Sequence, residues 1–273
     1  MKTVLAAAIS LFVASAAMAQ SMQMPNMPMK MAPMQGGQPA SDARDPDYSD
    51  GIPMSPMHGM DMNDDAPVGM LLIDQLETTS GLDGSGKAWD IEGWYGNDTN
   101  RLWLRSEGEG TSHALREGDI EALWYHTVAA YWGTQVGIRQ DVGQGEHRRW
   151  AAFGIQGLAP YWFELEATAY VGEQGRTALR LRAEYELLFT QRLVLQPELE
   201  MNVYGKPDRQ ERTGAGLSDV QFGLRLRYEI RRWFAPYVGV QWTQRVGGGA
   251  GYARADGEAV FDRQWVAGLR VWF

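Results

Sequence analysis

The chain has 273 residues, a formal net charge of −9 and a mean hydropathy of −0.36. This acidic balance argues against nucleic acid as a partner, because phosphate binding requires clustered Lys and Arg. The absence of cysteine excludes disulfides, thiolate nucleophiles and cysteine-based zinc or iron–sulfur sites, so any metal must be held by Met, His or carboxylates. The uneven placement of Met, Trp and Pro divides the chain into three parts.

Residues 1–19 have the pattern of a secretory signal peptide. Lys2 supplies the positive charge, residues 4–17 are apolar, and Ala17-Met18-Ala19 forms an A-x-A cleavage site. The alternative is an N-terminal core or anchor helix, but its length is marginal for spanning and the residues that follow are polar. We therefore expect export, with a mature chain that begins at Gln20 in the periplasm.

Residues 20–69 are predicted to be a disordered tail. They contain eight of the 12 prolines and ten of the 14 methionines, with no Leu, Phe or Trp. Seven Asp stand against Lys30 and Arg44. Such a segment cannot bury enough apolar surface to offset the entropy that ordering it would cost.

Residues 70–273 contain all 11 Trp and show apolar side chains with a period of two. For example, Phe163, Leu165 and Ala167 alternate with Glu164 and Glu166, which is typical of a strand with one apolar and one charged face. The pattern predicts about twelve antiparallel strands, near residues 70–77, 88–96, 101–107, 118–128, 133–141, 150–157, 162–171, 177–187, 193–204, 217–230, 234–243 and 264–273.

The connections between these strands favour an up-and-down transmembrane β-barrel of the outer membrane. Connections of three to five residues alternate with mostly longer ones, including 78–87, 108–117 and 142–149, and the last strand ends in an aromatic residue, Phe273. Aromatic residues such as Trp132, Trp150 and Trp233 lie near strand ends, where interfacial girdles are expected. A soluble sandwich or lipocalin-like barrel is the alternative, but its closed core could not hold so many charges.

Two groups of methionines in the tail are candidate copper ligands. Thioether sulfur is a soft neutral ligand that selects Cu(I), and spacings of one or two residues let a flexible chain wrap several sulfurs around one ion. The alternative is low-complexity composition without function. The candidate ligands are Met22, Met24, Met27, Met29, Met31 and Met34 in the first group, and Met54, Met57, His58, Met60 and Met62 in the second.

Strand direction predicts an acidic patch inside the barrel. With a periplasmic N-terminus, six inward carboxylates of three neighbouring strands fall in the periplasmic half, beside Arg225 and Arg227. They either brace or plug the barrel through salt bridges, or form an electronegative vestibule for cations. The six are Glu164, Glu166, Glu184, Glu186, Glu198 and Glu200.

Other candidate sites are weaker. His113 and His147 lie in predicted loops, and His126 is expected near the periplasmic rim. The Gly-rich stretch 247–251 lacks a following helix and Lys-Ser/Thr, which argues against a phosphate loop. No Ser–His or Asp–His pair is brought together by a motif, so a barrel enzyme is the least favoured function.

The chain from about Leu71 to Phe273 resembles the copper resistance protein B family of outer-membrane proteins. The resemblance rests on segments 72–77, 93–96, 102–105, 156–186, 216–219, 227–232 and 234–239. It implies copper tolerance at the outer membrane without fixing the direction of copper movement. Members carry a variable Met/His-rich N-terminal region, and the single histidine of this tail, His58, favours Cu(I) over Cu(II).

The sequence thus predicts a non-enzymatic outer-membrane protein that sequesters copper or passes it at or across the membrane, with its tail in the periplasm. Its expected partners are copper ions, outer-membrane lipid and, as a candidate, a periplasmic multicopper oxidase of the same resistance system. A general porin or structural barrel with an incidental Met-rich tail is the alternative.

Overall fold

The computed structural model describes residues 66–273, apart from 83, 112–113 and 146. The predicted signal peptide (1–19) and nearly all of the tail (20–69) therefore lie outside the described residues. Within them, the first strand begins at Val68, two residues before the predicted start of the barrel. No helix of this part of the chain is both long and apolar enough to cross a membrane.

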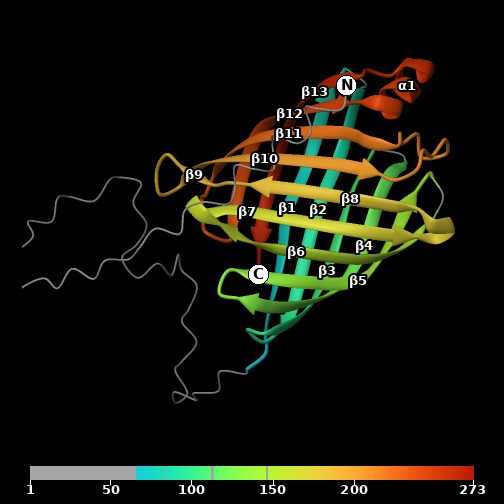
Figure 1. Ribbon diagram of the computed structural model, residues 1–273. Coiled ribbons are helices and arrows are strands. Elements are labelled where there is room, and N and C mark those ends of the chain that lie inside the picture. The colour runs from blue at the N-terminus through green and yellow to red at the C-terminus, as the bar shows by residue number, and fades with distance from the viewer. Residues whose placement is uncertain (1–65, 83, 112–113, 146) are drawn as a thin grey trace, which may run out of the picture. The chain divides into compact units, whose positions relative to one another are not determined.

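The described residues form a closed antiparallel barrel of twelve strands, as the sequence predicted (Figure 1). Consecutive strands pair along the chain, and β13 closes the barrel by pairing with β1. The strands are β1 (Val68–Gly81), β2 (Gly84–Gly96), β3 (Asn100–Gly110), β4 (Leu115–Ala129), β5 (Trp132–Gly143), β6 (Arg149–Ala159), β7 (Phe163–Gly172), β8 (Thr177–Glu184) with its extension β9 (Leu187–Leu188), β10 (Leu193–Tyr204), β11 (Gly216–Tyr228), β12 (Phe234–Arg245) and β13 (Phe261–Trp272).

β8 and β9 are one strand with an interruption. Both pair with β10 in a single register, in which Glu184 faces Glu198 and Leu187 faces Leu195. Pro197 of β10 therefore lies opposite Tyr185, and it has no amide hydrogen to donate to that neighbour. The missing donor explains why the ladder breaks at residues 185–186.

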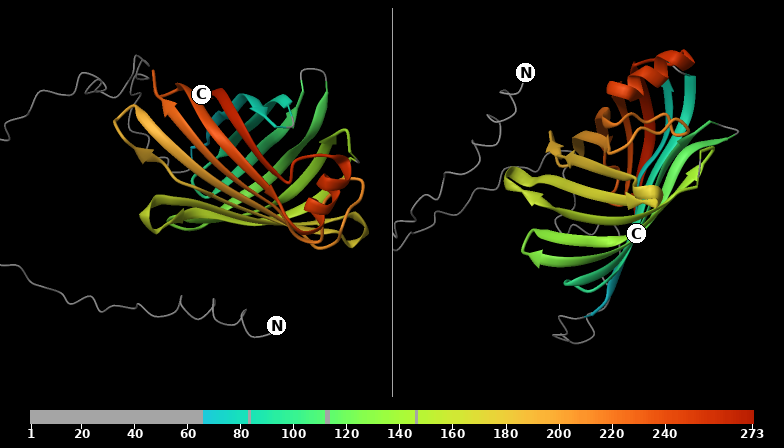
Figure 2. Two further views of the ribbon diagram at one scale, coloured as in Figure 1. Left: turned by 90° about the horizontal axis from the view of Figure 1, so that it is seen from above. Right: turned by 45° about the vertical axis from the view of Figure 1, so that its right-hand side comes forward.

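The two ends of the barrel differ. One end, here called the short-turn end, carries the connections 97–99, 130–131, 160–162, 189–192 and 229–233, together with the C-terminus. The opposite end, the loop end, carries the long connections 205–215 and 246–260; the second contains helix α1 (Gly247–Asp256) (Figures 1 and 2). The Gly-rich stretch 247–251 thus opens a helix itself, contrary to the sequence prediction.

Three connections of the loop end are shorter than predicted. β1 continues to Gly81 and β2 begins at Gly84, where a connection over 78–87 was expected, and the strands around 108–117 and 142–149 are extended in the same way. In this stretch Thr78 pairs with Lys87. The backbone ladder does not depend on apolar side chains, so it continues beyond the point where the apolar period ends.

The outer surface of the strands is apolar and the interior is polar. Large side chains such as Leu104, Ile138 and Phe153 are more than half exposed on the outside. By contrast, Glu121, Gln135, Thr168 and Arg227 are almost completely buried in the interior. An apolar band around a polar lumen is the arrangement of a barrel embedded in a membrane.

Not every aromatic residue near a strand end belongs to an interfacial girdle. Trp150 is buried inside the barrel, where its indole Nε1 donates a hydrogen bond to Asp141 Oδ2 (2.7 Å). It packs with Trp103, Leu123 and Tyr170 in a small hydrophobic cluster. The girdle prediction is therefore wrong for Trp150, because its position on β6 points to the lumen and not to lipid.

Candidate lumenal site

The lumen contains two cavities lined mainly by charged and polar side chains. The larger has a volume of about 590 Å³ and is lined mostly by residues of the loop-end half. The smaller, of about 110 Å³, includes Asp74, Glu164, Glu184 and Arg270 and lies toward the short-turn end. These cavities and the side chains between them form the candidate site.

The structure places the six predicted carboxylates on neighbouring strands, but not in one patch. Glu164, Glu166 and Glu184 line the smaller cavity, whereas Glu198 and Glu200 line the larger one. Glu184 is the direct neighbour of Glu164 on β7 and of Glu198 on β10. In the next row, Arg182 stands between Glu166 and Glu200. Glu186 lies in the break between β8 and β9. The inward alternation of these strands therefore places like charges directly opposite one another in one row.

Four of the six carboxylates form ion pairs with arginines. Glu166 Oε1 lies 2.8 Å from Arg105 Nη1, and Glu198 Oε2 lies 2.7 Å from Arg225 Nη1. Glu200 Oε2 lies 2.9 Å from Arg182 Nη2, and Glu186 Oε1 lies 2.6 Å from Arg227 Nη2. For these four the bracing interpretation is supported, because each negative charge has a cation in contact.

Glu164 and Glu184 differ from the other four. Within the part of the chain that the structure describes, neither has an arginine or lysine within ion-pair distance; Glu184 accepts one hydrogen bond from Gln196 Nε2 (2.7 Å). The nearby Arg270 is engaged by Asp74 at 2.5 Å. The smaller cavity consequently keeps two carboxylates whose charge no contacting cation neutralises.

A buried polar network connects β1 with β11 and β12, across the intervening β13. Arg225 contacts both carboxylate oxygens of Glu77, with Nε–Oε2 at 3.2 Å and Nη2–Oε1 at 3.1 Å. Glu77 also accepts a hydrogen bond from the Tyr237 hydroxyl (2.9 Å), and Arg225 donates to Gln75 (2.9 Å). Side chains from strands that are distant in the sequence are thereby tied together inside the barrel.

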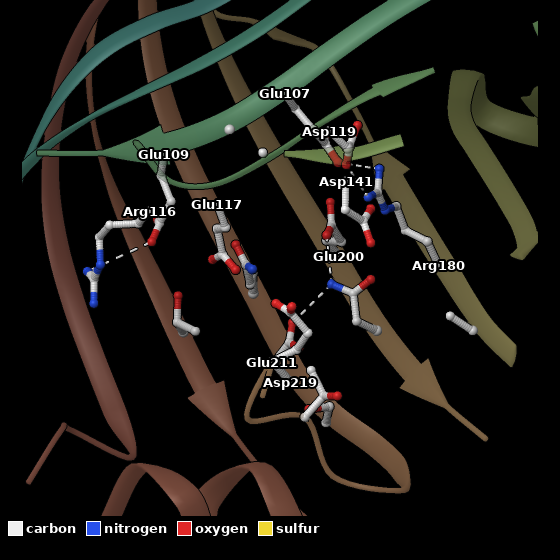
Figure 3. Close-up of a pocket in the computed structure, with 18 of the residues that line it drawn as sticks. Glu107, Glu109, Arg116, Glu117, Asp119, Asp141, Arg180, Glu200, Glu211 and Asp219 are labelled. Carbon is white, nitrogen blue, oxygen red and sulfur yellow. Dashed lines mark hydrogen bonds and ion pairs between the residues drawn. The ribbon is translucent and has the colours of Figure 1, made fainter. Parts of the chain in front are cut away.

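Of the carboxylates that line the larger cavity, sequence reasoning identified Glu198 and Glu200 but missed the others. Figure 3 shows Glu117, Glu200, Glu211 and Asp219 reaching into it from β4, β10, the β10–β11 connection and β11. Two of them form ion pairs with arginines, Glu200 with Arg182 (2.9 Å) and Glu211 with Arg148 (3.8 Å). The alternation of Glu117, Asp119 and Glu121 along β4 is a signal that could have identified this wall.

The β10–β11 connection is fastened at the mouth of the larger cavity. Asp208 is buried and forms ion pairs with Arg148 and Arg176, which come from two other connections of the loop end. Its Oδ1 also accepts the backbone N–H of Gln210 (2.9 Å). The connection thus lies over the lumen, where Glu211 lines the cavity.

The predicted copper ligands of the tail, from Met22 to Met62 and including His58, lie outside the described residues, as does His113. In the described part, no group of three or more His, Cys, Asp or Glu side chains could hold a metal ion. His126 is half-buried near the short-turn end, and its Nδ1 lies 3.0 Å from Asn100 Oδ1. His147 is exposed in the β5–β6 connection.

Comparisons with known proteins agree with this architecture and give the family. Residues 68–273 match the family model described as "Copper resistance protein B precursor (CopB)". The "Copper resistance protein B homolog" of Pseudomonas syringae pv. tomato is 49% identical over 215 residues, covering 79% of this chain and 73% of the relative. The "Copper resistance protein B" of Escherichia coli is 43% identical over 217 residues, covering 80% and 73%.

Among solved structures, the NanC porin aligns with a TM-score of 0.51 at 9% identity, covering 72% of this chain and 98% of the porin. This likeness concerns the fold alone. The family match extends over the whole barrel, and both relatives are far above the identity at which homology is in question. The chain therefore belongs to the copper resistance protein B family, which supports a role in copper resistance.

Proposed function

We propose that the protein is a non-enzymatic outer-membrane protein that binds copper through its Met-rich N-terminal segment and holds or passes it at the barrel. One observation carries this proposal: the same chain contains two groups of closely spaced methionines and a barrel of the copper resistance protein B family. Met and His are the donor types that suit Cu(I), and carboxylates alone would favour harder cations.

The attachment of the segment supports a periplasmic location. β1 joins the C-terminal end of the chain, where Leu71 and Phe273 exchange backbone hydrogen bonds of 3.1 and 2.9 Å. This is the short-turn end, and short turns face the periplasm in barrels of this kind. Copper bound by the Met clusters would then be held on the periplasmic side, at the end of the lumen where Glu164 and Glu184 line the smaller cavity.

The acidic patch is the second element of the proposal. Glu164 and Glu184 have no contacting cation among the residues that the structure describes, and they line the smaller cavity at the same end of the barrel. A carboxylate pair of this kind raises the local concentration of cations, as acidic rings do in cation pores. In this scheme the Met clusters select copper, and the carboxylates attract cations without selecting among them.

A general porin is less well supported by the geometry. Such a protein requires an open, water-filled lumen. Here Arg105, Arg182 and Arg225 contact carboxylates on other strands inside the lumen. The interior is therefore better suited to restrict passage than to allow free diffusion.

Growth on copper tests the proposal. A strain lacking the gene would be complemented with the natural chain or with a chain whose ten tail methionines, from Met22 to Met62, are replaced by Leu. We expect the substituted chain to assemble in the outer membrane but to restore copper tolerance poorly. The copper content of the periplasm should then differ from that of the strain complemented with the natural chain. Full restoration of tolerance by the Leu chain would contradict copper binding by the tail.

A further inference from the structure

Two arginines of β8 cross the lumen to the opposite wall. In the ring of strands, β2 is the sixth neighbour of β8 in either direction, so the two strands face each other across the barrel. Arg182 of β8 nevertheless reaches Asp90 of β2, with Nη1–Oδ2 at 3.3 Å. It also reaches Glu107 of β3, with Nη2–Oε2 at 2.7 Å.

Arg180 and Glu200 complete this layer. Arg180 forms ion pairs with Glu107 and with Asp119, the second at 3.1 Å. Arg182 is held at its own wall by Glu200 of β10, with Nη2–Oε2 at 2.9 Å. Glu107 therefore receives two guanidinium groups at once, and the side chains of opposite walls meet in the middle of the lumen.

The same side chains separate the two cavities. Asp90, Glu107, Asp119, Arg180 and Arg182 line both the larger cavity on the loop side and the smaller cavity on the short-turn side. These five residues therefore form a partition between the two chambers. An ion that moves directly from one chamber to the other therefore meets these ion pairs.

We propose that Arg182, together with Arg180, is an internal gate of the barrel. Its guanidinium group is a tethered cation that occupies the carboxylates of the passage. A cation can cross the partition only when this group leaves Asp90 and Glu107, and a divalent cation competes for those carboxylates because it carries more charge at a similar distance. The gate concerns passage through the lumen and does not depend on copper binding by the tail.

Conductance across a planar lipid bilayer in KCl tests the gate without copper. The natural full-length barrel is expected to conduct little. Arg182→Ala removes the bridge between β8 and the opposite wall, so its single-channel conductance should rise several-fold. The current should also become more selective for K⁺ over Cl⁻, since Asp90, Glu107 and Glu200 lose a positive partner.

Arg101→Ala is the matched control. Arg101 lies on β3 and stacks on Trp94 at 4.4 Å, and its Nε donates to the Asn97 carbonyl at 3.2 Å, so its contacts stay within the β2–β3 hairpin. This variant should conduct like the natural protein. Heat-modifiable mobility in gels would verify folding of each variant.

Arg182→Lys keeps the inference testable if the alanine variant does not fold. A single ammonium cannot reach Asp90, Glu107 and Glu200 together, so an intermediate conductance is expected. A folded Arg182→Ala or Arg182→Lys protein with the conductance of the natural chain would overturn the gate. A large conductance of the natural barrel would overturn it as well.

Discussion

Replacing Arg225 with Met tests whether the lumen is a packed polar interior or a water-filled pore. Both Arg225 and Glu77 are at least 95% buried, and their contact is bidentate. The substitution removes the guanidinium but roughly preserves the volume of the side chain. Glu77 would keep only the hydroxyl of Tyr237 as a hydrogen-bond donor among the partners described above.

The size of the effect depends on how much water surrounds the pair. Breaking a buried ion pair costs about 3–5 kcal/mol, because one charge stays buried without compensation. A solvated pair contributes only about 0–1 kcal/mol. Since Glu198 also loses a 2.7 Å contact with Arg225, we expect a loss near the upper part of the first range.

Urea unfolding in lipid vesicles would measure the free energy, with the folded fraction read from heat-modifiable gel mobility. The double variant Arg225→Met/Glu77→Met should recover more than half of the loss, since it leaves no unpaired charge between these positions. A loss below about 1 kcal/mol for the single variant would refute the reasoning and indicate a hydrated lumen.

Three further predictions follow from the site and the tail. Deleting residues 20–67, which stops short of β1, should leave a barrel with unchanged heat-modifiable mobility but reduced copper tolerance, because the segment lacks core residues. Failure of the truncated chain to assemble would contradict the division of the chain. Glu164→Gln with Glu184→Gln should slow copper uptake into liposomes, whereas an unchanged rate with lower thermal stability would leave only a bracing role for the pair. In titrations of tail peptides, the Cu(I) affinity of the 54–62 cluster should rise between pH 5 and 7 as His58 loses its proton. The affinity of the all-thioether cluster 22–34 should stay constant over the same range. Equal pH dependence of the two affinities would exclude His58 as a ligand.

Much of the barrel could be predicted because local alternation determines it. The period-two pattern of β7 and β8 was sufficient to assign Glu164 and Glu184 to the inner face and to make them neighbours. The connection between these two strands, residues 173–176, is short, so their register follows from sequence distance. The strand number and the faces of the strands were therefore accessible without a structure.

The contacts across the lumen were not accessible in this way. Arg182 and Asp90 are 92 residues apart, and they meet only because closure of twelve strands brings opposite walls within reach of a long side chain. The same closure decides that Glu166 is neutralised by Arg105 whereas Glu164 is not. Helix α1 was also missed, because its first three residues are glycines with low helix propensity and its stability depends on packing at the loop end.

A Cu(I) titration of the purified full-length protein against a chromogenic chelator tests the central claim most directly. The natural chain should remove Cu(I) from the chelator. The chain with Leu at the ten tail methionines should lose most of this capacity while its barrel remains folded. Equal copper binding by both folded proteins would contradict the account, because the copper ligands would then lie outside the Met clusters.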